Sequence, residues 1–349
     1  MATRTLQQTL EGHSDWVRSV AFSHDSKLLA SASDDWMIQI WDIGTRKLQQ
    51  TLEGHSDWVR SVAFSHDSKL LVSASDDSKV RIWDAATGVL QQMLEGHYGS
   101  IYSVAFSHDS KLLASASNDM TVRIWDVATR ILQTLKGHTG WVRSVAFSHD
   151  SKLLVSTSDD RTVRIWDVAT RTLQQTLKGH TNWVHLVAFS YDSKLLASAE
   201  MLIVRIWDTA TGALQQTLTF NNIVTTLSFD ITNLILITNI GVFKVKRSQI
   251  PSLSPSSKES DDKSSCEGSQ IPSLSLSSKE LDDRSSYEGL GISGCWITWK
   301  AQNILWLPPD FRGMTWAISL TGSTVAVGCQ SGRVFFIEVS SDILRNYFS

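Results

Sequence analysis

A repeat of 41 or 42 residues constrains the fold of this 349-residue chain more than any other feature. Each unit holds a Gly-His pair and, further on, a Trp-Asp pair. The pairs occur five times in register, at Gly12-His13, Gly54-His55, Gly96-His97, Gly137-His138 and Gly179-His180, and at Trp41-Asp42, Trp83-Asp84, Trp125-Asp126, Trp166-Asp167 and Trp207-Asp208. A fixed period of this length indicates one structural unit that is repeated and that buries its apolar surface against its neighbours.

Each unit reads as four short strands. In the first unit the strand-like segments are 17–23, 28–33, 37–42 and 47–52, and turn residues separate them. Short strands at this spacing are typical of all-β proteins, and four-stranded sheets of this kind bury both faces when they pack radially around an axis. The chain resembles the WD-repeat β-propeller family over residues 1–218.

Beyond the fifth unit the signature residues fade. Residues 219–247 predict a degenerate blade. Residues 248–291 form a Ser-rich insertion of two 21-residue repeats, which we interpret as a disordered loop because its composition cannot form a packed core. Residues 292–349 predict the closing blade region, which lacks a fourth strand of its own. Residues 2–10 are identical to residues 169–177, which close the fourth unit, so we expect the N-terminal strand to complete the last blade.

The number of blades follows from the length. Without the two insertion repeats 307 residues remain, which gives about 44 residues per blade for seven blades and about 38 for eight. The family period of roughly 40–45 residues favours seven. Eight blades stay open as an alternative, because residues 286–312 hold more strand candidates than one blade needs.

The resemblance implies a hydrogen-bonded relay inside each blade, in which a His, an Asp of the second tight turn, a Ser or Thr and the Trp take part. In the first blade these are His13, Asp35 and Trp41, with Ser31 or Ser33 as the hydroxyl. The other relay residues are His55, Asp77, Trp83, His97, Asp119, Trp125, His138, Asp160, Trp166, His180 and Trp207. Buried His and Asp side chains need partners, so we interpret the relay as structural rather than catalytic. The fifth repeat is one residue short, and we expect a weaker blade in which only Glu200 can pair with His180.

Variation among the near-identical repeats concentrates just after Gly-His and around the second tight turn. In the propellers that the chain resembles, both segments lie on one rim around the central channel, where partners commonly bind. We therefore predict a partner-binding rim of Trp16, Arg18, Asp34, Trp36, Trp58, Arg60, Asp76, Tyr102, Asn118, Trp141, Arg143, Asp159, Arg161, Trp183 and His185. Trp, Tyr and Arg are enriched at binding hot spots, and exposed Trp without a partner lowers solubility. The alternative interpretation is that these Trp side chains pack between blades.

Other functional classes find no support in the sequence. The chain has no phosphate loop, no Gly-x-Ser-x-Gly elbow and no zinc-binding helix motif, and its three Cys share no metal-ligand spacing. We therefore expect no enzyme activity, no cofactor and no metal. His24, His66, His108 and His149 stand in Ser-His-Asp turns, where we expect solvated side chains rather than metal ligands.

The charge and the apolar pattern restrict the partners further. A net charge of −3 gives no electrostatic case for nucleic acid, and no apolar run is long enough for membrane insertion. The low Cys content and the absence of a secretory signal predict a cytoplasmic location.

A closer resemblance concerns both the repeat unit and the C-terminal region. The unit Gly-His-Ser-Asp-Trp-Val-Arg-Ser-Val-Ala-Phe-Ser, together with residues 296–299, 305–312 and 328–334, resembles the fungal NACHT-and-WD-repeat proteins of the vegetative-incompatibility type. This implies a sensor propeller, which an NTPase and an effector module precede in longer relatives. We expect a non-catalytic recognition propeller that binds a protein partner or a glycoconjugate. The alternative is an adaptor subunit of the ubiquitin-ligase substrate-receptor or mitochondrial-fission type.

Overall fold

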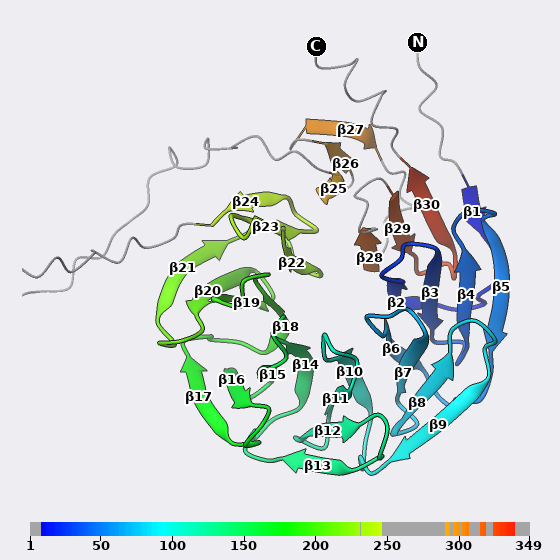
Figure 1. The fold of residues 1–349 in the computed structure, drawn as a ribbon. Helices are drawn as coiled ribbons and strands as arrows, with labels where there is room; N and C mark the ends of the chain where they lie inside the picture. The colour runs from blue at the N-terminus through cyan, green and yellow to red at the C-terminus, as the bar shows by residue number, and fades with distance from the viewer. Residues whose placement is uncertain are drawn as a thin grey trace, which may run out of the picture.

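The structure is a computed structural model that describes residues 8–230, 232–245, 290–293, 296–299, 302–306, 315–318 and 324–338. Every regular element in these ranges is a β-strand. The strands form antiparallel sheets that surround a common axis, as the view in Figure 1 shows. The arrangement is a seven-blade β-propeller, which confirms the fold class and the blade count that the sequence favours.

The five regular repeats form five four-stranded blades, each with its strands in sequence order. Blade one holds β2 (Val17–Phe22), β3 (Leu28–Ser33), β4 (Ile38–Asp42) and β5 (Lys47–Leu52). Blade two holds β6 (Val59–Phe64), β7 (Leu70–Ser75), β8 (Lys79–Asp84) and β9 (Leu90–Glu95). Blade three holds β10 (Ile101–Phe106), β11 (Leu112–Ser117), β12 (Val122–Asp126) and β13 (Leu132–Leu135). Blade four holds β14 (Val142–Phe147), β15 (Leu153–Ser158), β16 (Thr162–Asp167) and β17 (Leu173–Lys178). Blade five holds β18 (Val184–Phe189), β19 (Leu195–Glu200), β20 (Ile203–Asp208) and β21 (Leu214–Thr219).

The hydrophobic core lies between the blades. Ala30 and Ile40 of blade one, for example, belong to one buried cluster with Val62, Leu71 and Trp83 of blade two. The same arrangement recurs between blades three and four and between blades four and five. Because each sheet buries its faces only against its neighbours, the ring is stabilised as a unit.

The N-terminal strand closes the ring. The last blade consists of β28 (Thr315–Ile318), β29 (Thr324–Gly328) and β30 (Val334–Glu338), and β1 (Gln8–Leu10) adds its fourth strand. β1 pairs antiparallel with β30, so that Leu10 lies opposite Val334. Leu10, Val334 and Phe336 share a buried cluster with Val17 and Trp41 of blade one. The predicted closure is confirmed for these residues, while residues 2–7 lie outside the described ranges.

Two three-stranded sheets lie in the chain between the fifth blade and the last blade. Among the described residues, blade six has three strands, β22 (Leu227–Phe229), β23 (Ile235–Thr238) and β24 (Val242–Lys244). A separate three-stranded sheet of β25 (Leu290–Ser293), β26 (Trp296–Trp299) and β27 (Gln302–Trp306) lies farther from the axis in Figure 1, with β25 next to β23 and β29. This sheet contains the surplus strand candidates in residues 286–312, on which the alternative of eight blades rested. Most of the predicted Ser-rich insertion lies outside the described residues.

Candidate functional site

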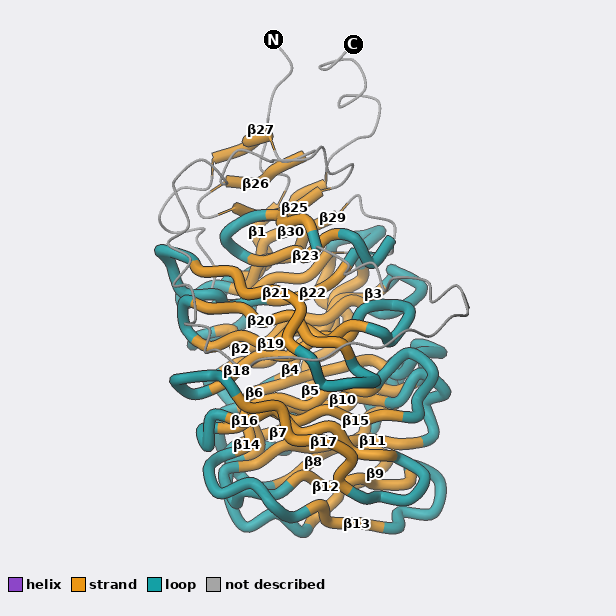
Figure 2. The backbone as a smooth tube through the Cα atoms, turned by 90° about the vertical axis from the view of Figure 1, so that its left-hand side faces the viewer, coloured by secondary structure: helices purple, strands orange, loops and turns teal. Residues whose placement is uncertain are grey.

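Loops lie at both ends of the strands (Figure 2). Hydrogen bonds and strand pairing place the predicted rim residues of the regular blades at one of these ends. In blade one the backbone N–H of Asp34 donates to the carbonyl of Trp16 at 2.9 Å, which joins the segment after Gly-His to the second tight turn. The equivalent bond joins Asp76 to Trp58, and Asp159 to Trp141. The turn between the first two strands, which holds His24, lies at the opposite end because Phe22 pairs with Leu29 there.

A β-bulge sets the direction of one rim side chain in every regular blade. The pairing of β2 with β3 shifts register between Val17 and Ser19, so Arg18 is the extra residue of the innermost strand. A bulge bends the strand and redirects the side chain of the extra residue. The extra residues at the same position in the next four blades are Arg60, Tyr102, Arg143 and His185. All five belong to the predicted rim.

The three bulge arginines form ion pairs with carboxylates of the second tight turn. Arg143 donates from Nε and Nη2 to the two carboxylate oxygens of Asp159, both at 2.8 Å. Arg18 makes the same two-point contact with Asp34, and Arg60 with Asp76. Two parallel bonds between planar groups fix the guanidinium more strongly than a single contact would. Each rim arginine is therefore held in place and its charge is balanced.

Two of the fixed guanidinium groups, those of Arg18 and Arg143, lie between tryptophan rings of adjacent blades, whereas that of Arg60 contacts Trp58 of its own blade. The Cζ atom of Arg18 lies 4.7 Å from the ring centroid of Trp16 and 5.6 Å from that of Trp58 in the next blade. Arg143 contacts Trp141 of its own blade at 4.9 Å and Trp183 of blade five at 5.9 Å. Distances below about 6 Å permit cation–π attraction. The rim thus forms a belt of alternating aromatic and guanidinium groups across several blades.

The tryptophans of the belt are nevertheless open to solvent. The exposed fractions are 38% for Trp16, 40% for Trp58, 43% for Trp141 and 57% for Trp183. Trp58 and Trp183 pack against an arginine of the preceding blade. Trp16 and Trp141 pack against the arginine of their own blade. None of the four is fully buried, although Trp58 and Trp183 thus contact the preceding blade.

The second tight turn displays a large side chain from a strained backbone position. Trp36 has a φ of 72° and is 50% exposed. Ser78, Met120 and Arg161 occupy the same position in blades two to four, with φ between 65° and 66°. This left-handed region favours Gly, and other residues there cost about 1–3 kcal/mol. Trp36, Met120 and Arg161 are thus exposed side chains at backbone positions where glycine would be less strained.

Some predicted rim residues are placed differently from expectation. Asp34 is buried, 5% exposed, so a direct partner contact by its side chain is wrong, and it holds Arg18 instead. In blade three Tyr102 and Asn118 stand where other blades have the Arg–Asp pair, so the two positions change together. The imidazole Nε2 of His185 is within 2.8 Å of the carbonyl of Val224 in blade six, which ties this side chain to a neighbouring blade.

Sequence reasoning missed several exposed apolar side chains at the same end. Tyr98 is 91% exposed and lies beneath Arg123, whose Cζ is 5.8 Å from its ring. Met201 and Leu202, in the shortened turn of blade five, and Ile223 before blade six are 41–49% exposed. Tyr98 follows Gly-His directly, where other blades have Ser or Thr, so its deviation from the repeat was the available signal.

The relay residues come together below the rim. His13 contacts Asp35 through Nδ1 and Ser31 through Nε2, both at 2.8 Å, and Trp41 donates from Nε1 to Ser31 at 2.9 Å. Ser31 is therefore the relay hydroxyl, whereas Ser33 donates to the carbonyl of Asp15. The same three contacts occur in blade two (His55, Asp77, Ser73, Trp83), blade three (His97, Asp119, Ser115, Trp125) and blade four (His138, Asp160, Ser156, Trp166).

Burial and pairing set the charge states of the relay. Burial would raise the pKa of Asp77, but its hydrogen bonds to His55 and Arg81 hold it well below the usual value. Burial lowers the pKa of His55, although Asp77 opposes this shift. The His55 side chain is fully buried, so a substrate could not reach its imidazole. This geometry supports the structural role that the resemblance implies.

Blade five uses a different carboxylate. Glu200 lies 3.4 Å from Nδ1 of His180, longer than the 2.7–2.8 Å of the His–Asp contacts, and Arg205 donates to Glu200 at 2.6 Å. The backbone N–H groups of Thr181 and Asn182 donate to the same carboxylate. Burial and the charge of Arg205 lower the pKa of His180 to about 4. The longer Glu side chain compensates for the missing turn residue, but its contact with His180 is looser.

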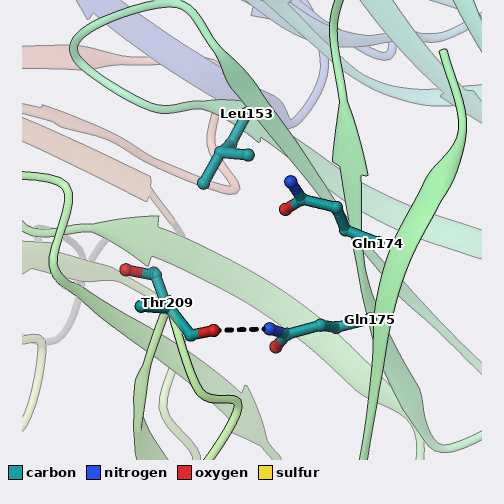
Figure 3. A pocket seen from close by; sticks show the side chains of 5 residues that line it. Leu153, Gln174, Gln175 and Thr209 are labelled. Carbon is teal, nitrogen blue, oxygen red and sulfur yellow. Dashed lines mark hydrogen bonds between the residues drawn. The ribbon is translucent and has the colours of Figure 1, made fainter. Parts of the chain in front are cut away.

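A hollow of about 470 Å³ lies between blades four and five, at the end opposite the rim (Figure 3). Gln175 donates from Nε2 to the carbonyl of Ala210 at 2.9 Å across this junction. The hollow is lined by Leu153, Gln174, Gln175, Thr209 and Ala210, and none of these side chains is an acid or a base. In the part of the chain that the structure describes, no group of three or more His, Cys, Asp or Glu could hold a metal ion. The same residues include no helix that could span a membrane.

The fold and the relay define a class of protein, the WD-repeat propellers. The sequence matches the profile of the family WD domain, G-beta repeat, over residues 4–42, 46–84, 88–126, 129–167 and 171–208, more than half of the chain, and the chain belongs to this family. A relative is Vegetative incompatibility protein HET-E-1 of Podospora anserina, 45% identical over 126 residues. The aligned region is 36% of this chain and 7% of that protein. The resemblance predicted from the repeat unit is confirmed.

Proposed function

We propose that this chain is a non-catalytic recognition propeller of the sensor type, which binds a protein partner on the Trp/Arg rim. WD-repeat propellers are generally protein-interaction or scaffold domains. One observation carries the proposal: four tryptophans from four blades are 38–57% exposed at one end of the ring. Partly exposed Trp and Arg side chains that are already immobilised lose little conformational entropy on binding.

Because the rim arginines are already paired with carboxylates, we expect a partner that binds mainly by burying apolar surface. The carboxylates of Asp34, Asp76 and Asp159 already neutralise the three bulge arginines, and in blade three the pair is replaced by uncharged Tyr102 and Asn118. An acidic or phosphorylated ligand would have to compete with these carboxylates. The exposed Trp, Tyr98 and Met side chains instead favour an apolar or aromatic segment of a protein over a strongly charged one.

The relation to HET-E-1 supports the sensor type, and we include a cytoplasmic location in the same proposal. In a longer relative, binding at this rim would be transmitted to an N-terminal NTPase and effector module. For this chain we propose recognition alone, without a cofactor or catalytic step.

Footprinting of a captured complex tests the proposal. Tagged protein is incubated with extract of its source cells, and side-chain oxidation by hydroxyl radicals is compared with and without the bound partner. We expect protection of Trp16, Trp58, Trp141 and Trp183, and unchanged oxidation of the exposed outer-edge residues Leu48 and Leu173. Protection of the outer edge with open tryptophans would contradict the proposal.

The salt dependence tests the chemistry of the partner separately. For an apolar interface, raising the salt from about 0.05 M to about 0.5 M should change the affinity by less than about threefold. A much steeper loss of affinity, with the rim tryptophans still protected, would mean that the partner binds at the rim but is acidic rather than apolar.

A further inference from the structure

Four histidines form a continuous row at the end of the ring opposite the rim. The ring centroids of His24 and His66 are 4.1 Å apart, those of His66 and His108 4.7 Å, and those of His108 and His149 4.2 Å. Tyr191 of blade five continues the row at 4.5 Å from His149. We call His24, His66, His108 and His149 the imidazole row. The expectation of solvated side chains holds for His66, but His24, His108 and His149 are partly buried, and for them it is wrong.

The row lies on the junctions between blades. The backbone N–H of His66 donates to the hydroxyl of Ser110 in the next blade at 2.9 Å, and that of His108 to Ser151 at 3.0 Å. His149 makes the same bond to Ser193. At the two ends of the row, Asp25 donates from its backbone N–H to Ser68, and Asp192 to the side-chain oxygen of Asn233. A backbone hydrogen bond to the next blade therefore lies beside each ring contact.

The surroundings of the row favour neutral rings. Burial, followed by the charges of His149, His66 and His24, lowers the pKa of His108 to about 4. Burial and neighbouring histidines also lower the pKa of His24 and of His149. The Nδ1 atoms of His24 and His149 are buried without a hydrogen-bond partner among the described residues.

Carboxylates near the row partly oppose these shifts. Asp25 favours the charged form of His24, and Asp150 and Asp192 favour that of His149. Most of these charges are already shared with lysines at 3.4–3.7 Å, in the pairs Asp25–Lys27, Asp67–Lys69, Asp109–Lys111 and Asp150–Lys152. The carboxylates thus cannot neutralise a fully protonated row.

We propose that the imidazole row is a proton-operated latch, which holds five neighbouring blades together when its rings are neutral and loosens their junctions when adjacent rings are protonated. Two positive charges at 4–5 Å repel each other, and the repulsion acts directly on the turns that carry the hydrogen bonds between blades. Among the described residues the rim end has no comparable row of histidines, so repulsion between adjacent protonated rings would act at one end of the ring only.

The sign of the pH effect follows from the lowered pKa values. Unfolded histidines protonate near pH 6.5, whereas His108 in the folded chain does so near pH 4. The stabilisation by the row is therefore complete above pH 6.5 and is lost as the pH falls from 6.5 towards 4. Local opening at the junctions is expected within the same window.

Hydrogen exchange of the full chain at pH 7 and pH 5 tests the latch. After correction for the intrinsic pH dependence of exchange, the amides of His66, His108 and His149 should lose about tenfold in protection at pH 5. In the quadruple variant His24→Asn, His66→Asn, His108→Asn, His149→Asn, the loss at the row should disappear. The rim-end amides of Asp34, Asp76 and Asp159 lie beside the relay and report any acid effect on it, so their change should be the same in the unmodified chain and in this quadruple row variant.

Two results would overturn the latch. One is unchanged protection of the three amides at pH 5, and the other is an equal loss of protection in the quadruple variant. If that variant fails to fold, a pH titration of the unmodified protein, monitored by NMR of the histidine rings, tests the latch instead. Stepwise protonation of the row below pH 6.5 supports the latch, and a single shared transition at pH 6.5 contradicts it.

Discussion

The relay and the rim of each regular blade contain the same kinds of side chain but differ in exposure. In blade two, His55, Ser73 and Trp83 are buried and bonded to one another, while Trp58 is 40% exposed above them. Both regions pair a cation with a carboxylate, Arg81 with Asp77 in the relay and Arg60 with Asp76 on the rim. The two regions thus differ in depth and not in residue type: the relay is buried inside the blade, whereas the rim, where we propose that a partner binds, is open to solvent.

Removal of a relay carboxylate should have the largest effect on stability. Asp77→Ala leaves His55 and Arg81 without their buried partner, and loss of one member of a buried pair costs about 3–5 kcal/mol. Chemical denaturation of the variant measures this loss. Trp58→Ala on the rim of the same blade should cost about 1 kcal/mol or less, because the ring is already partly solvated. Equal losses in the two variants would remove the distinction between relay and rim.

Acidification should weaken the relay before it alters the rim. The pKa values of His55, His97, His138 and His180 are lowered by burial, so these rings stay neutral in the folded chain while they protonate in the unfolded chain. The free energy of unfolding should therefore be highest above pH 6.5 and fall as the pH drops towards 4. Denaturation curves at several pH values measure this dependence. To separate the relay from the imidazole row, the slope is compared with that of the quadruple row variant, which should retain a residual decrease.

Blade five offers a smaller test of how length and chemistry combine. Glu200→Asp shortens the side chain that accepts from Thr181 and Asn182, and the carboxylate should lose at least one of these bonds. A loss of about 1–2 kcal/mol is expected from thermal or chemical denaturation. The opposite change in a regular blade, Asp160→Glu, is a matched control, since its turn is built for the shorter side chain. Unchanged stability of Glu200→Asp would show that the contact is not limited by side-chain length.

Trp36 should show the smallest effect on stability. Trp36→Gly removes an exposed ring and relieves the positive φ, while glycine adds freedom to the unfolded chain, so the net change should lie within about 0.5 kcal/mol. Partner affinity should fall in the same variant. Denaturation and partner binding measured on one preparation separate the two. A large loss of stability in Trp36→Gly would show that Trp36 stabilises the fold by packing, which contradicts this prediction.

The strand order was predictable from the repeat period, and the closure by the N-terminal strand from the identity of residues 2–10 with residues 169–177. The relay positions were predictable only through the resemblance to the WD-repeat family. The expected segments 28–33 and 47–52 agree with β3 and β5 as observed. The bulge at Arg18 and its equivalents could not be predicted, since a register shift leaves no separate mark in an alternating strand pattern. Burial of Asp34 and stacking of the turn histidines also depend on contacts between blades, which one repeat does not contain.

The most direct test of the central claim compares two quadruple variants for partner binding. The rim variant carries Trp16→Ala, Trp58→Ala, Trp141→Ala and Trp183→Ala. The edge variant carries Leu48→Ala, Leu90→Ala, Leu173→Ala and Leu214→Ala, which removes comparably exposed apolar side chains (41–49%) from the outer strands of the same four blades. If the rim binds the partner, quantitative capture should fall at least about tenfold for the rim variant and remain unchanged for the edge variant. Retained capture by the rim variant, with its fold intact, would contradict the claim.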